Sequence, residues 1–163
     1  MPMSAVQPAF EMIPAFDEAI TSSLYAGELS KLFERIHRSY FWESKARFAE
    51  ARRGLRSTAS LTQGWNTYDA ESPNDVSRQL ADRVLDQLEV NLLPPALVTA
   101  SAEGGVAISF VKDDRRAVIE IYNTGELAAA VYTNEGQPVV WELNADDTSL
   151  QGTVNQIRVH LAE

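Results

Sequence analysis

The sequence predicts an α+β fold: an antiparallel four- to five-stranded meander packed against helices, with an N-terminal helical extension that includes one long amphipathic helix. Two observations predict it. Apolar residues recur every three or four positions before Pro94-Pro95 and at alternate positions after it, which indicates helices followed by strands. The alternating segments are separated by short stretches containing Gly, Asn and Asp, and connections of this kind join antiparallel neighbours.

The composition divides the chain into three predicted parts, at 1–16, 17–62 and 63–163. Residues 1–16 contain three prolines and predict an extended lead-in. Residues 17–62 predict a helical N-terminal segment. Residues 63–163 predict an acidic α+β domain.

Two helices are predicted in the N-terminal segment. The first begins near Asp17 and is interrupted at Gly27, because glycine is a poor helix former. The second extends from about Leu29 to Leu55 and carries an apolar stripe at helical spacing. At 1.5 Å per residue, roughly 27 residues extend about 40 Å, which is longer than a small domain is wide. Part of this helix is therefore expected to contact a second copy or another protein. The stripe consists of Leu29, Leu32, Phe33, Ile36, Tyr40, Phe48, Ala51 and Leu55.

A further helix is predicted to begin with Ser72 as its N-cap and Pro73 at its first position, and to end before Pro94. Five segments with alternating apolar residues follow, and Asp146 or Asp147 then caps a closing helix that buries Leu150, Val154, Ile157 and Leu161. The predicted strands span 96–100, 106–111, 117–122, 127–133 and 139–143.

Charge is distributed unevenly along the chain. Residues 31–56 hold eight Lys and Arg against three Glu, whereas residues 63–163 hold six Lys and Arg against sixteen Asp and Glu. An acidic body repels phosphate backbones, so nucleic acid is not the expected partner. The start of the chain does not resemble a secretory signal, and no segment is apolar enough to span a membrane, so a cytoplasmic location is expected.

No residue pattern indicates catalysis, a cofactor or a metal site. The chain has no cysteine, and His37 and His160 do not stand at metal-binding spacings relative to acids. Asp113-Asp114 and Asp146-Asp147 fall where a turn and an N-cap need aspartate. Gly104-Gly105 precedes a strand rather than a helix, as expected of a hairpin turn and not of a phosphate-binding loop.

The basic part of the long helix contains aromatic residues, and three interpretations remain open. It is a solvated basic face whose aromatic residues belong to the core and whose charges meet the acidic half of the molecule or of a dimer mate, a protein-binding helix, or a nucleic-acid-binding helix. The predicted partner-binding residues are Arg35, Arg38, Phe41, Trp42 and Lys45.

The segment Gly64-Trp65-Asn66-Thr67-Tyr68-Asp69-Ala70 with Pro73, followed by a helix and by Gly104-Gly105 at the start of a hairpin, resembles a loose group of small uncharacterised bacterial proteins. Their pattern reads GWxxYxAxxP, a helix, and a GG-led hairpin. The resemblance covers residues 64–125. Asp69 stands where many relatives have Gly, and Phe110 where they have Trp.

Trp65 and Tyr68 have two interpretations. They pack over the start of the following helix as a structural clasp, or they form an exposed platform that binds a ligand together with Asp69. The clasp is the simpler explanation because both residues immediately precede a helix start.

The sequence favours a non-enzymatic protein–protein interaction module over an enzyme. One specific form is an antitoxin- or immunity-like inhibitor of a basic protein, because a strongly acidic domain attracts basic partners. A homodimer through the long helix is a further expectation. The alternative is a small-ligand-binding protein or enzyme with a site around Trp65 and Tyr68.

Overall fold

The computed structural model describes residues 16–66, 69–132 and 136–162, and side chains from residue 27 onward within those ranges. Residues 1–15 of the lead-in predicted at 1–16, and Tyr68, therefore lie outside the described residues, while Phe16 is the first residue of a helix. The chain divides into two compact units, Met1–Tyr40 and Phe41–Glu163. The first helix, α1, contributes residues to both.

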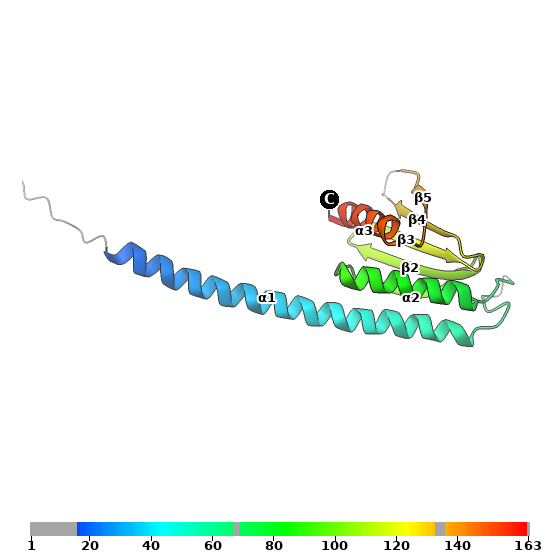
Figure 1. Ribbon diagram of the computed structural model, residues 1–163, viewed down its shortest axis with the longest axis horizontal. Helices are drawn as coiled ribbons and strands as arrows, with labels where there is room; N and C mark the ends of the chain where they lie inside the picture. The colour runs from blue at the N-terminus through cyan, green and yellow to red at the C-terminus, as the bar shows by residue number, and fades with distance from the viewer. Residues whose placement is uncertain (1–15, 67–68, 133–135, 163) are drawn as a thin grey trace, which may run out of the picture. The chain divides into compact units, whose positions relative to one another are not determined.

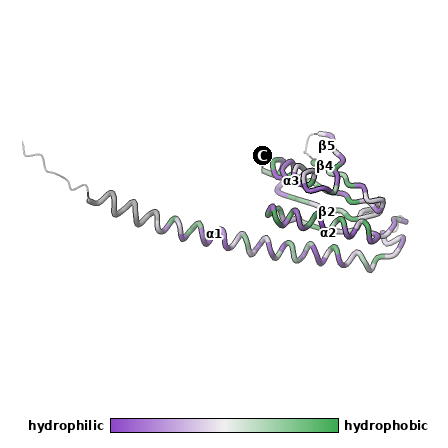
Figure 2. Tube along the Cα trace, in the orientation of Figure 1, coloured by the Kyte–Doolittle hydropathy of each residue, from purple (hydrophilic) through white to green (hydrophobic). Residues whose placement is uncertain are grey.

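Helix α1 spans Phe16–Ser57 and is followed by a short 3₁₀ turn at Thr58–Ser60. The predicted interruption at Gly27 is wrong, since the helix continues through this glycine. A single glycine costs a helix interior about 1 kcal/mol relative to alanine, and 41 other helical residues outweigh that cost. Along the part of α1 that Figure 2 colours, hydrophobic and hydrophilic residues are interspersed.

Helix α2 spans Asp75–Val90, and its N-cap is Asn74 rather than the predicted Ser72. The Asn74 side chain accepts a hydrogen bond from the Ser77 amide at 3.0 Å. Asn123, in the turn between two strands, fixes this start, because its Oδ1 accepts the Asn74 amide at 2.9 Å and its side-chain amide donates to the Ser72 carbonyl at 3.0 Å. A tertiary contact of this kind could not be predicted from local capping rules alone.

Five strands form one antiparallel sheet in the order β1-β2-β3-β4-β5, which confirms the predicted meander. Their two-residue and longer turns contain residues with positive φ, including Asp113 at 53° and Gly104 at 86°. Gly105 cannot be replaced easily, because a Cβ there would lie 2.1 Å from the Ile121 carbonyl oxygen. The strands are β1 (Leu97–Ala100), β2 (Gly105–Lys112), β3 (Arg115–Tyr122), β4 (Leu127–Tyr132) and β5 (Val139–Leu143).

Helix α3 spans Asp147–Ala162 and closes the fold. Asp146 caps it as predicted, accepting the Ser149 amide at 2.9 Å. Helices α2 and α3 lie against the same face of the sheet (Figure 1). The predicted α+β class is therefore confirmed.

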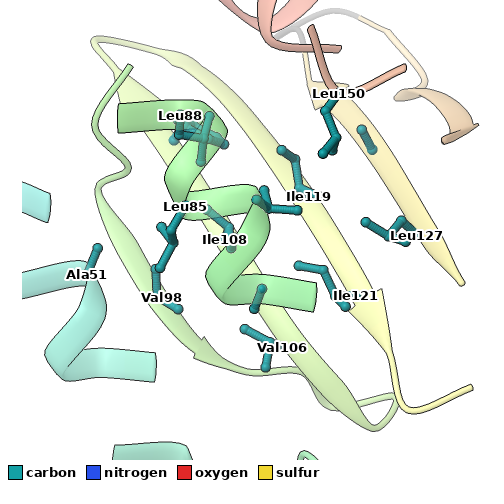
Figure 3. Packing of buried hydrophobic residues seen from close by; sticks show 14 of the residues in the cluster. Ala51, Leu85, Leu88, Val98, Val106, Ile108, Ile119, Ile121, Leu127 and Leu150 are labelled. Atoms are coloured by element: carbon teal, nitrogen blue, oxygen red, sulfur yellow. The ribbon is translucent and has the colours of Figure 1, made fainter. Parts of the chain in front are cut away.

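The hydrophobic core lies between this helix layer and the sheet. Leu85 and Leu88 of α2 face Ile108 and Ile119, while Leu150 of α3 packs toward the other end of the sheet (Figure 3). Helix α1 also belongs to this core, because Phe48, Ala51 and Leu55 are buried in the same cluster. The sequence-based boundary at 62/63 places these three residues outside the α+β domain, whereas the structure places them inside its core.

Gly54 allows α1 to approach the edge of the sheet. A Cβ at this position would lie 2.5 Å from the carbonyl oxygen of Val98 in β1. Since β1 is an edge strand, its outward backbone groups need cover, and α1 supplies it. The absence of a side chain at residue 54 is therefore a packing requirement.

We expect Gly54→Ala to destabilise the fold by about 1–3 kcal/mol, because the backbone of α1 or β1 must shift to relieve the contact with Val98. Gly152→Ala is the matched control in helix α3, where nothing lies within 4 Å of the added Cβ. The control should stabilise the protein by about 0.5–1 kcal/mol through helix propensity. Urea unfolding measures both changes, and equal stability of the two variants would contradict the packing requirement.

Candidate protein-interaction surfaces

The first candidate surface is an apolar stripe on α1, consisting of Leu29, Leu32, Phe33, Ile36 and Tyr40, which we call the α1 stripe. Each of these residues is between 48 % and 61 % exposed. In the sequence of α1 the same spacing continues with Ser44, Phe48, Ala51 and Leu55, and those four residues are all buried. The apolar residues in the second half of this pattern are thus buried in the core, whereas no described residue covers those in the first half.

Phe41 and Trp42 follow the α1 stripe directly. Trp42 is 65 % exposed and Phe41 is 45 % exposed, as expected of a contact surface. Their rings form an edge-to-face pair with centroids 5.8 Å apart. The Lys45 ammonium lies 5.6 Å from the Phe41 ring centre, which fixes this ring beside a cation.

Lys31 and Arg47 of α1 pair with acids of the same helix, Glu28 and Glu43, and four further basic residues fall into two groups. Lys45 and Arg52 form ion pairs with α2: the Lys45 ammonium lies 3.1 Å from Glu89, and the Arg52 guanidinium lies 2.7 Å from Asp82, 2.7 Å from Asp86 and 3.0 Å from Glu89. Hydrogen bonds from Arg52 and then Lys45 lower the pKa of Glu89. These charges meet the acidic half of the same molecule, as the first interpretation of the basic segment predicts. Its other half is wrong for most of the aromatic residues, because only Phe48 is buried, whereas Phe33, Tyr40, Phe41 and Trp42 are exposed.

Arg35 and Arg38 belong to the second group. Both side chains are exposed, and neither forms an ion pair among the residues that the structure describes. Of the five residues predicted to bind a partner, Arg35 and Arg38 belong to the first compact unit and Phe41, Trp42 and Lys45 to the second, and Lys45 is already engaged with Glu89. Their role in binding stays a prediction.

The loop around Trp65 bears on the choice between a structural clasp and a ligand platform. Trp65 is half-buried, and its indole Nε1 has no hydrogen-bond partner among the described residues. The Gly64 amide donates to the Ala70 carbonyl at 3.0 Å, and the Ala70 amide donates to the Asn66 side chain at 3.2 Å, so the loop closes on itself. Asp69 is exposed and has a φ of 62°. Tyr68 is not described, so the ligand platform stays a prediction.

The second candidate surface is the face of the sheet opposite α2 and α3, which we call the open sheet face. Strand register places two rows of side chains on it: Thr99, Ala107, Glu120, Ala128 and Glu142 in one row, and Leu97, Ser109, Val118, Ala130 and Val140 in the next.

The middle of the open sheet face is a hollow of about 410 Å³. Its floor consists of small residues, including Ala107, Ala128 and Ala130, and Tyr122 and Tyr132 line its sides. Large exposed apolar residues surround it, among them Leu97 and Val140. No described helix covers this face, in contrast to the opposite one.

Glu120 lies in this hollow. Burial raises the pKa of its carboxyl, the hydrogen bond with the Ser101 side chain lowers it, and the nearby charge of Glu103 raises it, so that the net shift is upward. One carboxyl oxygen, Oε2, is buried and has no hydrogen-bond partner among the described residues. Sequence reasoning did not select Glu120. Its position could have been predicted from the alternation of β3, because Ile119 and Ile121 point into the core and Glu120, between them, points to the opposite face of the sheet.

The remaining polar residues have structural roles. His160 is buried, and its Nε2 lies 3.1 Å from the Tyr132 carbonyl oxygen. Asp113 occupies the β2–β3 turn, and Asp146 caps α3. The described part of the chain contains no group of three His, Cys, Asp or Glu arranged to hold a metal ion. Within that part, no helix has both the length and the apolar composition needed to cross a membrane.

Comparison of the sequence and structure with protein-family models, curated proteins and solved structures gave no match. The two surfaces themselves are therefore the main indication of function.

We expect Glu120→Gln to stabilise the protein at pH 7. Because the folded pKa of Glu120 is raised, the folded chain holds the proton more tightly than the unfolded chain, and stability falls as pH rises from the ordinary glutamate value through the folded pKa. Glutamine cannot ionise and avoids this loss. The advantage should disappear below about pH 4, where the carboxyl is protonated in both states.

Urea unfolding between pH 3 and pH 8 measures this difference. Glu142→Gln, an exposed carboxylate in the same cross-strand row, is the control and should change stability little. A Glu120→Gln variant that is less stable than the native chain at pH 7 would show that the ionised carboxylate stabilises the fold.

Proposed function

We propose that this chain is a non-enzymatic protein–protein interaction module that binds its partner through the α1 stripe. The observation that carries the proposal is the exposure of all five stripe residues on a helix whose continuing pattern is buried. Contiguous exposed apolar surface of this kind is typical of sites that bind another protein.

The composition of this surface supports the proposal. Aromatic residues and arginine are enriched in protein interfaces and supply most of the binding energy in many of them. The α1 stripe and its neighbours contain Phe33, Tyr40, Phe41 and Trp42, with Arg35 and Arg38 on the same helix. An amphipathic helix binds by placing its apolar face against a complementary apolar surface, with anchors at three- and four-residue spacing.

An antitoxin- or immunity-like inhibitor of a basic protein is a specific form of this proposal. The support for it is the net charge of −9, which favours association with a basic partner. The alternative class, an enzyme or small-ligand-binding protein centred on Trp65 and Tyr68, has less support, because the Trp65 loop closes on its own backbone.

The double substitution Leu32→Glu with Ile36→Glu should weaken partner binding at least tenfold. Burial of one large aliphatic side chain contributes about 1.5–3 kcal/mol, and 1.4 kcal/mol corresponds to a factor of ten. Both positions are about half exposed, so the fold should be unaffected. Binding is measured by sedimentation equilibrium for self-association and by quantitative affinity capture for other proteins.

The single substitution Ser30→Glu serves as the control for added negative charge on α1. Ser30 is exposed and lies about 120° around the helix from Ile36 at 100° per residue. This control should bind as the native chain does. If the double variant keeps every partner of the native chain at native affinity, the α1 stripe is not the contact surface.

A further inference from the structure

The chain has two uncovered apolar surfaces of different shape. The α1 stripe presents large side chains on a helix, whereas the open sheet face presents a floor of alanines with a hollow of about 410 Å³. We infer that the α1 stripe of one copy binds the open sheet face of a second copy, in a reciprocal dimer. This inference rests on the proposed function, because it names the occupant of the α1 stripe.

The shapes of the two surfaces match. A sheet with one helix layer leaves its other face to be covered by another element, and a helix covers a sheet by inserting its large side chains over small ones. Ala128 and Ala130 leave room in the middle of the sheet, while Leu97 and Val140 stand on either side of it. Leu32, Phe33 and Ile36 supply the volume that the alanines lack.

The charges also match. The open sheet face carries Glu103, Glu120 and Glu142, none of which forms an ion pair among the described residues. The opposing segment of α1 carries Arg35, which lies on the flank of the stripe about 100° from Ile36 and is likewise unpaired among them. Contact with an arginine would neutralise acids on a partly buried surface, where the attraction is screened less than in bulk water.

Two-fold symmetry makes the arrangement self-limiting. If the α1 stripe of each copy binds the open sheet face of the other, one closed dimer covers both stripes and both sheet faces. No surface is then left for a third copy to bind. Pairing of α1 with α1 would cover the stripe but not the sheet. This difference favours the sheet of a second copy over its helix as the occupant.

Ala128→Arg tests the open sheet face separately from α1. Ala128 lies between Glu120 and Glu142 in its cross-strand row, so an arginine there has acidic neighbours and is tolerated by the fold. It fills the hollow and repels Arg35 of the second copy. Val90→Arg, at a 79 % exposed position on α2 in the opposite layer, is the control with the same change in charge. We expect at least a tenfold loss of self-association for Ala128→Arg and none for the control.

Mixing two defective chains gives the decisive result. The Ala128→Arg chain keeps an intact α1 stripe, and the Leu32→Glu/Ile36→Glu chain keeps an intact sheet, so a mixture can form one of the two contacts. Native mass spectrometry should detect the mixed dimer while each variant alone stays monomeric. Any one of three results would overturn the inference: the native chain is monomeric at about 100 µM, the Ala128→Arg chain associates as the native chain does, or the mixture contains no mixed dimer. The proposed function would still stand if the Leu32→Glu/Ile36→Glu variant, and not Ala128→Arg, loses binding to another protein.

A second measurement covers the case in which Ala128→Arg does not fold. The chain has no cysteine, so Arg35→Cys in one copy and Glu142→Cys in another supply the only thiols in a mixture. A bis-maleimide of about 10 Å should link the two variants to each other more than it links either variant to itself. Preferential linking of the Arg35→Cys chain to itself would instead indicate pairing of α1 with α1 and would overturn the inference.

Discussion

The close contact between α1 and the edge of the sheet at Gly54 is the constraint on which the remaining packing depends. The missing side chain lets the helix backbone reach the Val98 carbonyl of β1. At this distance Phe48, Ala51 and Leu55 enter the same core as α2, and Arg52 reaches three acidic residues of α2. The second half of α1 is therefore part of the α+β domain and not a separate arm attached to it.

Two apolar surfaces, the α1 stripe and the open sheet face, are not covered by this packing. The apolar pattern of α1 does not end where its contacts with the domain end, and the α1 stripe has large apolar residues about half exposed. The sheet likewise has its helices on one face only (Figure 1). Hydrophobic burial is the main favourable contribution to association, and an interaction module needs such surface to remain outside its own core. Glu120 limits how apolar the open sheet face can be, and its raised pKa reflects the cost of its burial.

Much of the fold could be predicted because the signals are local. The alternation after Pro94-Pro95 and the turn residues Gly104, Gly105 and Asp113 predicted the strands within two residues, and Asp146 was among the two predicted caps of α3. The predicted start of α2 was wrong because the Asn123 side chain, almost 50 residues away in sequence, accepts a hydrogen bond from the Asn74 amide. The predicted interruption at Gly27 was wrong because the helical residues on both sides of this glycine outweigh its low helix propensity.

The candidate surfaces could be predicted less completely. Residues of the α1 stripe were identified by spacing, but spacing cannot distinguish its buried half from its exposed half. The hollow around Glu120 depends on the register of β2, β3 and β4, which brings Ala107 of β2 and both Ala128 and Ala130 of β4 to the same face of the sheet. The alternation within one strand predicts only which residues of that strand share a face. It does not predict which residues of other strands lie beside them. The partner, the dimer and the antitoxin-like role stay predictions.

Hydrogen–deuterium exchange at increasing protein concentration tests most directly whether α1 serves two environments. The amides of residues 46–57 belong to the core and should be protected at every concentration, because their exchange requires the domain to open. The amides of residues 28–40 should exchange rapidly in dilute solution and become protected as the chain associates. Equal protection of both segments in dilute protein, or exchange at residues 28–40 that does not change with concentration or with a partner, would contradict the account.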